Sequence, residues 1–590
     1  MSINSNLYFP RDRIKALLLL LLVCLVYLPF LGSPLVFDDL PFFKNGPSGF
    51  SNQLFELQLR WFPYFSIGFT WVFAGENLSA YRMQNLLLHG LNVLMLLLLM
   101  RLWIGVFITD ASKEKLANWG AWLGALVFAC HPLAVYGVGY LIQRSILMAT
   151  LFTLVMQLAY LRGLLENNKR YMALAVVAYF LAVFSKEHSV MAPAILLPLT
   201  WLLYARNKFS PHVLLVTWLG FALVGLLAVL SLKQVAGAPI LGAAYEADAA
   251  SLFGQQQVLQ GTHVLHLLSV LTQAALFFKY CLLMLVPSPA WMSVDMRETF
   301  LLSWRDWTSW LGLLAFVGYG VFALRCLLRG GRTALLGLAL LYPWLLFMTE
   351  FSTVRVQEIF VLYRSYLWMP GFMLLVPLLV SVLPNKISIQ NRSFPLSGGR
   401  LGCGLTRRNS KASTPTLTLP LQGGGDIGVS RFVLAGVLIV LLLVPLAWNR
   451  LWVFADNYRL WNDAVQLLHR DQTPGANRIF YNRGQAAAAL HKWDEAIADF
   501  QRAVTLSPQL APIHHELGFA YLNAGRYQDA LAQFDVAIAL KPDNASFYYA
   551  KAMSLKRLHR DDLAMQQMEK SCELKNMTAC LIVQMNAVRK

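Results

Sequence analysis

The chain has 590 residues, of which 57% are hydrophobic and 14% are charged, with 49 Lys and Arg against 31 Asp and Glu. A soluble globular protein has about 25% charged residues, so the composition excludes that class and predicts a polytopic membrane protein. The basic residues form short clusters between apolar runs, which suits cytoplasmic loops and argues against a nucleic-acid partner. The seven cysteines include no CxxC pair, which argues against a zinc or thioredoxin site.

The first apolar run, "RDRIKALLLLLLVCLVYLPFLG", starts with three basic residues and ends at Gly32. It is too long for a signal peptide and lacks a small-residue cleavage site, so we interpret it as an uncleaved span. Its basic flank predicts a cytoplasmic N-terminus and an inner-membrane protein with many passes. Residues 33–82, rich in aromatic residues, Gly and Pro, are then expected to form an extracytoplasmic first loop with amphipathic pieces on the membrane interface.

Further apolar runs predict about eleven spans in total, and basic residues mark every second connection. Residues 263–286 either cross the membrane or form a re-entrant or interfacial hairpin; we prefer the hairpin, because it returns the basic loop 325–332 to the cytoplasm. Residues 385–431, basic and rich in Gly, Ser, Thr and Pro, are predicted to be a disordered cytoplasmic loop. The other spans are expected near 83–103, 117–130, 140–161, 171–184, 189–204, 213–232, 307–327, 333–350, 366–384 and 432–448.

Residues 451–590 are soluble in character and repeat with a period of 34. This period, with Gly, Ala, Phe, Ala and Pro at fixed offsets, indicates tetratricopeptide repeats. The pairs are Gly484 and Gly518, Ala496 and Ala530, Phe500 and Phe534, Ala503 and Ala537, and Pro508 and Pro542. A degenerate third unit contains Ala552, Ala564 and Met568, and residues 460–471 are expected to cap the front. The fold class is therefore all-α: a membrane bundle over 1–450, then an extracytoplasmic α-solenoid whose concave face suits a peptide or a partner helix.

Cys572 and Cys580 straddle an expected helix–turn–helix in "SCELKNMTACL". The pair resembles the clasp of cysteine-rich Sel1-like repeats, which implies a disulfide; the alternative is two small buried residues. A disulfide requires an oxidising compartment, which the predicted topology provides.

Two adjacent carboxylates, Asp38 and Asp39, directly follow the first span in "VFDDLPFFKNG". Acids at a membrane edge can deprotonate a hydroxyl or hold a cation, or they can simply be solvated. Other polar residues are expected at the same ends of the spans, where an unpaired charge is costly and so marks a site. These are the cations Arg144, Lys186 and Arg364, suited to phosphate, and the supporting residues His131, Glu187, Asp295 and Glu358. The alternatives are that His131 caps a helix, that Lys186 and Glu187 are a neighbouring ion pair, and that Arg364 snorkels to headgroups.

The order of these motifs resembles the TMTC family of protein O-mannosyltransferases and its bacterial relatives, within the GT-C class of glycosyltransferases. "VFDD" is similar to the acidic first loop of that family, and "YRMQNLLLHGLNVLMLLLL" to its second span. "ACHPLAVYGVGYLIQRSILMATLF", "FSKEHSVMAPAILLPL" and "WMSVD" resemble its His-Pro, Ser-Lys-Glu and Ser-x-Asp segments. One departure is "YRSYLWMPG", in which Tyr363 stands where relatives carry an acid before the basic residue; Glu358 is a candidate substitute.

The resemblance implies transfer of a sugar from a polyprenyl-phosphate donor in the membrane to a hydroxyl of an envelope or secreted acceptor protein, which the repeats recruit. Asp38 or Asp39 would act as the base, and Arg144, Lys186 and Arg364 would stabilise the leaving phosphate. No cofactor is implied, and no cluster of ligands demands a metal, although a divalent ion is compatible with the acids. The alternatives are transfer of a lipid-linked oligosaccharide, and a non-enzymatic membrane-anchored repeat scaffold for envelope assembly. A transporter is disfavoured, because no paired inverted repeats with broken helices are evident.

Overall fold

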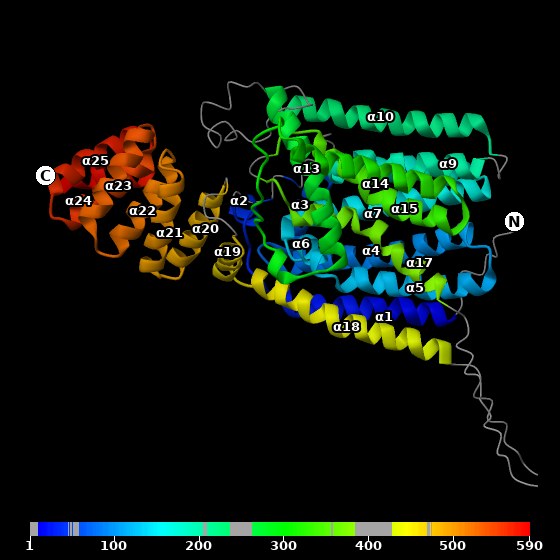
Figure 1. The fold of residues 1–590 in the computed structure, drawn as a ribbon. Coiled ribbons are helices and arrows are strands. Elements are labelled where there is room, and N and C mark those ends of the chain that lie inside the picture. Colours follow the sequence, from blue (N-terminus) through cyan, green and yellow to red (C-terminus); the bar gives the residue numbers. More distant parts are fainter. Residues whose placement is uncertain are drawn as a thin grey trace, which may run out of the picture.

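A bundle of long helices is followed by a stack of shorter helices at one of its ends (Figure 1). The structure is a computed structural model that describes residues 10–589, except 45–46, 48–49, 51–57, 205–208, 237–261, 356–357, 384–426, 469–472 and 474. Within these residues every regular element is a helix, as the sequence predicts. The predicted disordered loop 385–431 lies outside the described residues up to 426.

The bundle is built from long apolar helices that run roughly side by side (Figure 1). They are α1 (Pro10–Tyr27), α4 (Leu78–Phe107), α5 (Ala111–Cys130), α7 (Arg144–Glu166), α8 (Lys169–Ser185), α10 (Pro211–Ala236), α14 (Leu311–Leu328), α15 (Gly331–Phe347) and α18 (Ile427–Phe454). Leucines on the outer helices are exposed, for example Leu223 and Leu441, whereas small residues mediate close contacts inside. A Cβ at Gly337 would collide with the backbone of α14, so α14 and α15 approach closely only because this residue is glycine.

Eight helices in the described part are long and apolar enough to cross a membrane, or nine if α5 and the bent segment Pro132–Val138 form one span. About eleven were predicted. The eight include His263–Leu285, which was not predicted to cross, and they leave out four predicted spans. One of these, 117–130, lies in the bent pair, and the other three are short or broken. Residues 171–184 lie in the 17-residue α8, residues 189–204 are divided between η5 (Glu187–Ile195) and α9 (Leu196–Tyr204), and residues 366–384 between η9 (Leu362–Leu367), α16 (Met369–Met373) and α17 (Leu375–Val382). Pro193 lies inside η5 and removes a helix hydrogen bond, whereas Pro370 lies in the first turn of α16.

The hairpin predicted at 263–286 is wrong, because residues Thr262–Leu285 form one continuous helix, α13. Near the start of α13, the Nε2 atom of His266 lies 2.7 Å from the carbonyl oxygen of Phe351, just after α15. Near its end, the carbonyl oxygen of Met284 lies 3.2 Å from Nε2 of His131, just after α5. Both ends of α13 therefore lie at the repeat-facing end of the bundle, although its length and composition also suit a span.

The C-terminal stack consists of helix pairs, and it confirms the predicted repeats. The helices are α19 (Asn457–Gln466), α20 (Ala476–Ala489), α21 (Trp493–Leu506), α22 (Ala511–Asn523), α23 (Tyr527–Leu540), α24 (Ala545–Arg557), α25 (Asp561–Glu573) and α26 (Met577–Arg589). Phe500 and Phe534 are fully buried, and their rings fill the space over Gly484 and Gly518, where any Cβ would collide. α19 packs against α20, as expected of the front cap, and α18 extends to Phe454, beyond the predicted domain boundary at 450.

Candidate functional site

The two acids of the first loop point to different surroundings. Asp39 opens α2 (Asp39–Lys44) and is fully buried; its carboxylate accepts hydrogen bonds from the backbone N–H groups of Ile142 (2.8 Å) and Leu141 (3.4 Å). Burial raises the pKa of Asp39 to about 7, against the lowering effect of these bonds and of Arg82. The role of Asp39 in the structure is thus to hold the first loop against the segment after α5.

Asp38 is half-buried and lies beside charged residues of other elements. Its backbone N–H donates to the hydroxyl oxygen of Tyr140 at 3.0 Å. Burial raises the pKa of the Asp38 carboxyl, whereas a hydrogen bond with Tyr140 and the charges of Arg478 and Lys186 lower it. Phe37, with φ of +51°, turns the backbone immediately before the pair.

A buried ionic cluster forms around Arg364 in η9. The Arg364 guanidinium, 3% exposed, donates to Oε2 of Glu350 at 2.9 Å and to Oε2 of Glu358 at 3.1 Å. Glu350 also lies 3.1 Å from Nε of Arg355 and 3.2 Å from Nε2 of His188. Arg364 is therefore anchored by two carboxylates, and Glu358 is indeed the acid that pairs with it despite the Tyr363 departure.

Lys186 and Glu187 lie beside this cluster but do not pair with each other. Glu187 accepts two hydrogen bonds from Arg60, one of them 2.9 Å from Nε. Although burial opposes ionisation, Arg60 and Lys186 hold the pKa of Glu187 well below its ordinary value. The Lys186 ammonium lies 5.2 Å from the centre of the Tyr363 ring and is 97% buried as a residue. Burial, with Arg60 and Arg364, lowers the pKa of Lys186 to about 7, so its charge is poised near neutral pH.

A third group joins the bundle to the repeats. Asp295 is buried, and its Oδ2 accepts hydrogen bonds from Arg297 at 2.6 Å and from Arg478 at 2.9 Å. Arg478 belongs to α20, the first helix of the first repeat. Nearby, Arg450 in α18 donates to Asp463 of α19 (3.0 Å) and to the carbonyl oxygen of Met292 (2.6 Å).

A small pocket lies between these groups. Its walls combine the first loop, the segment after α5, the 294–295 and 358–363 segments and the first repeat. The lining residues are Phe37, Tyr136, Tyr140, Val294, Asp295, Glu358, Phe360, Val361, Leu362, Tyr363 and Arg478. The pocket thus has a mostly apolar and aromatic wall, and its charged residues are two carboxylates and the guanidinium of Arg478.

The structure places two predicted site residues outside this group. Arg144 is buried and donates to Asn85, Ser66, Thr70 and the carbonyl oxygen of Tyr81, which links α3 (Trp61–Ala74), α4 and α7. His131 caps the segment after α5: its Nδ1 accepts from the N–H of Leu133 at 3.2 Å, while Nε2 faces Met284. Both side chains are thereby engaged in holding helices together. No group of three or more metal-ligating side chains lies together in the described part of the chain.

Sequence reasoning missed six residues of the site: Arg60, His188, Arg297, Glu350, Arg355 and Arg478. The sequence could have indicated Glu350, because it is an acid at the end of an apolar run. No pattern indicates Arg60, which lies in an irregular loop, or Arg478, which lies at an ordinary position of a repeat.

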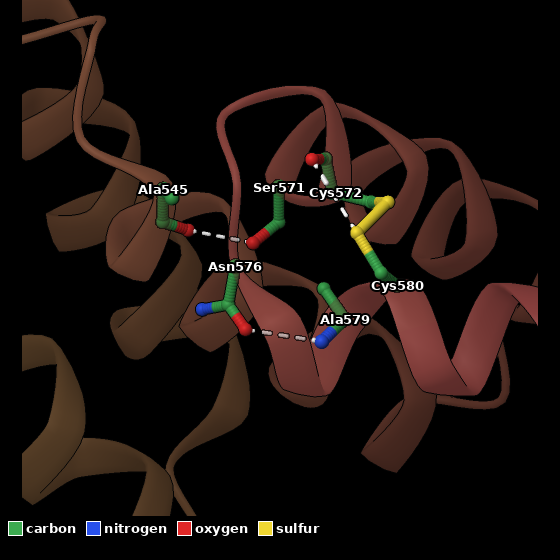
Figure 2. Close-up of a disulfide and its surroundings, with 6 residues drawn as sticks. All are labelled: Ala545, Ser571, Cys572, Asn576, Ala579 and Cys580. Carbon is green, nitrogen blue, oxygen red and sulfur yellow. Dashed lines mark hydrogen bonds between the residues drawn. A yellow bond between two sulfur atoms is a disulfide. The ribbon is translucent and has the colours of Figure 1, made fainter.

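The structure joins Cys572 and Cys580 in a disulfide between α25 and α26 (Figure 2), with Cα atoms 4.6 Å apart. Asn576, between the two helices, accepts a hydrogen bond from the N–H of Ala579 at 3.0 Å, and Ser571 donates to the carbonyl oxygen of Ala545 at 2.8 Å. The bond therefore fastens the last helix to the end of the stack.

The fold and its contacts define an all-helical bundle that carries a helical repeat domain on one end. Comparison with known proteins identifies the repeat domain: residues 484–525 match the model "TPR repeat", and residues 511–544 match the model "Tetratricopeptide repeat". The C-terminal region is thus composed of tetratricopeptide repeats. No curated protein matches the chain significantly.

Several solved structures are similar to part of the chain. The first TPR of Spaghetti (RPAP3) bound to HSP90 peptide SRMEEVD is 19% identical, over 19% of this chain and 94% of that one, with a TM-score of 0.19. MamA is 23% identical over 20% and 71% of the two chains, with a TM-score of 0.18. YrrB, described as a TPR protein with an unusual peptide-binding site, is 17% identical over 26% and 85%, with a TM-score of 0.21.

Proposed function

We propose that the chain is a membrane glycosyltransferase that moves a sugar from a polyprenyl-phosphate donor to a hydroxyl of an envelope or secreted protein. The observation that carries the proposal is the position of Asp38, near the charges of Lys186 and Arg478. Phe37, directly before Asp38, lines the pocket at the end of the bundle from which the repeats extend. A base and anchored cations around an apolar-walled pocket match the needs of a lipid-linked phosphate and a hydroxyl acceptor.

In this proposal the acceptor hydroxyl oxygen attacks the anomeric carbon of the sugar, and its proton passes to the Asp38 carboxylate. The bond between the anomeric carbon and the phosphate oxygen breaks with inversion, and the polyprenyl phosphate leaves with the electron pair. Lys186 and Arg364 stabilise the charge that builds on the leaving phosphate. Asp39 has no chemical step, because its oxygens face the backbone of residues 141–142.

The location follows from the same argument. The donor is a lipid, so the pocket belongs at a membrane surface, and a protein acceptor requires the extracytoplasmic face. We place the first loop and the repeats on that face and the N-terminus in the cytoplasm, in keeping with the basic flank of α1.

The repeats supply the second candidate function. Tetratricopeptide repeats present a concave surface for a protein partner and have no chemistry of their own, so a protein-binding role is supported by the matched repeats alone. In the first proposal this surface binds the acceptor; in the second, a membrane-anchored scaffold binds envelope proteins without modifying them.

Mass spectrometry of envelope proteins distinguishes the two candidates. Cells that lack the chain should lose a constant sugar mass from at least one envelope protein, and the intact gene should restore it. A set of envelope glycoproteins that is identical with and without the chain would contradict the glycosyltransferase and favour the scaffold.

The donor affinity should depend on pH through Lys186. Because the pKa of Lys186 is about 7 in the free protein, anion binding above that pH must also take up a proton, and the Kd should rise by up to about tenfold per pH unit. Below pH 7 the ammonium is already charged, and this dependence disappears. We expect titration with farnesyl phosphate from pH 6 to 9 to show the rise in the wild-type chain but not in Lys186→Arg, whose charge persists. Ionisation of the probe itself is the same for both proteins, so equal slopes would contradict the role of Lys186.

A further inference from the structure

The first repeat contributes a side chain to the pocket of the bundle. Arg478 lies on α20, yet its Nε donates to Asp295 of the bundle and its guanidinium stands 5.2 Å from the centre of the Phe37 ring. Phe37 directly precedes Asp38, and Arg478 lines the same pocket as Tyr140, Glu358 and Tyr363. The repeat domain therefore contributes the guanidinium of Arg478 to the wall of the pocket.

Arg478 is not needed to neutralise Asp295. Arg297 already pairs with that carboxylate at 2.6 Å, and both of these side chains are almost completely buried. A second guanidinium on the same oxygen leaves positive charge that acts on the acids around it, and Asp38 and Glu358 both interact electrostatically with Arg478.

The contact between the repeat domain and the bundle is closely fitted at this point. Gly475, with φ of +79°, starts α20, and the Arg297 guanidinium occupies the space where a side chain at 475 would lie. Arg450 fixes the neighbouring α19 through Asp463 and also holds the carbonyl oxygen of Met292. These contacts form only when the first repeat is docked on the bundle, and they fix the position of the helix that carries Arg478.

We propose that Arg478 is a positioning residue of the pocket, supplied by the first tetratricopeptide unit, which favours the charged carboxylate of Asp38 and fixes the turn at Phe37. The pocket is complete only while this unit is docked on the bundle. The inference rests on the proposed function, because it assigns Arg478 to the base of that reaction; it makes the repeat domain part of the catalytic unit as well as a recruiter of the acceptor.

The test is the pH profile of sugar transfer by membranes that contain the full chain, measured from pH 5 to 9 as glycan mass on the acceptor proteins. The base acts only when it is ionised. The fall in transfer at low pH, the acid limb of the profile, is therefore set by protonation of the Asp38 carboxylate. Removing a nearby cation raises the pKa of a carboxyl, so Arg478→Gln should move the acid limb upward by about one pH unit. On that limb transfer should fall about tenfold and recover at higher pH. Arg478→Lys should restore most of the wild-type limb, and Arg526→Gln, an exposed arginine of the second repeat, should leave it unchanged.

A second variant covers the case in which Arg478→Gln does not fold. Gly475→Val keeps every charge of the chain but displaces the start of α20, so it should also move the acid limb upward. The inference would be overturned if folded Arg478→Gln or folded Gly475→Val had its acid limb at the same pH as the wild type. An inactive Asp38→Asn variant in the same assay would still support the proposed glycosyltransferase, even if the role of Arg478 were contradicted. A fully active Asp38→Asn variant would contradict the proposed function itself.

Discussion

Replacing Asp38 with Asn should lower sugar transfer by about 10²–10⁴-fold, the usual contribution of a general base. Asn has the same shape as Asp, but its amide cannot take the proton of the acceptor hydroxyl. Asp38 is only half-buried, so the melting temperature of the chain in detergent should change little. The measurement is the rate of glycan addition to envelope proteins, with the amount of folded chain determined in parallel.

Asp39→Asn is the matched control, because it makes the same chemical change one residue away. Asp39 is fully buried and uses both oxygens to accept backbone N–H groups, and Asn would turn an NH₂ group toward one of them. We expect a loss of about 1–3 kcal/mol in the free energy of unfolding, with transfer per folded molecule largely kept. If Asp39→Asn instead removed transfer from a fully folded chain while Asp38→Asn did not, the two roles would be reversed.

Arg364→Met should lower the free energy of unfolding by about 3–5 kcal/mol, the usual effect of removing one partner from a buried ionic group. Arg364 is 3% exposed and binds Glu350, itself 1% exposed, together with Glu358. Without the guanidinium, Glu350 keeps Arg355 and His188, but Glu358 loses the arginine that it binds through Oε2. Thermal unfolding of the detergent-purified chain measures the effect.

Two further variants isolate the cause of that loss. Arg526→Met breaks an exposed ion pair with Asp529, whose partners are both about half exposed, and should have an effect of less than about 1 kcal/mol. The double variant Arg364→Met with Glu358→Gln should be more stable than Arg364→Met, because it removes the charge of the carboxylate that loses its arginine. A single Arg364→Met variant as stable as the wild type would mean that the cluster does not support the fold.

Most of the fold could be predicted because it depends on local patterns. Apolar runs of about twenty residues predict membrane helices wherever they lie, and five positions repeated at 34 residues predict the tetratricopeptide pairs, because each helix needs a small residue where its neighbour's Phe packs. Where local signals conflicted, prediction was weaker: residues 263–286 carry the hydropathy of a span, but hydrogen bonds near both ends keep α13 at one end of the bundle.

The candidate site was predictable only as a set of residue types. Each of Asp38, Lys186, Glu187, Asp295, Glu358 and Arg364 was visible as a charge at the edge of an apolar segment, and the structure brings them to one end of the bundle. The sequence could not say that Arg144 and His131 bind helix backbones and polar side chains instead, because either residue type can serve a ligand or a cap. Their partners come from segments far apart in the chain.

By itself, then, the sequence determined that this protein is an all-helical chain with long apolar helices and a repeat domain, because helix period, hydropathy and repeat spacing are properties of neighbouring residues. Only the tertiary structure decided the different surroundings of the two adjacent acids, because the backbone of residues 141–142 and the charges of Lys186 and Arg478 come from distant parts of the chain. It also decided that Arg478, more than 400 residues away in the sequence, lies over the ring of Phe37 next to Asp38 in the chain, because that proximity depends on how the first repeat docks on the bundle.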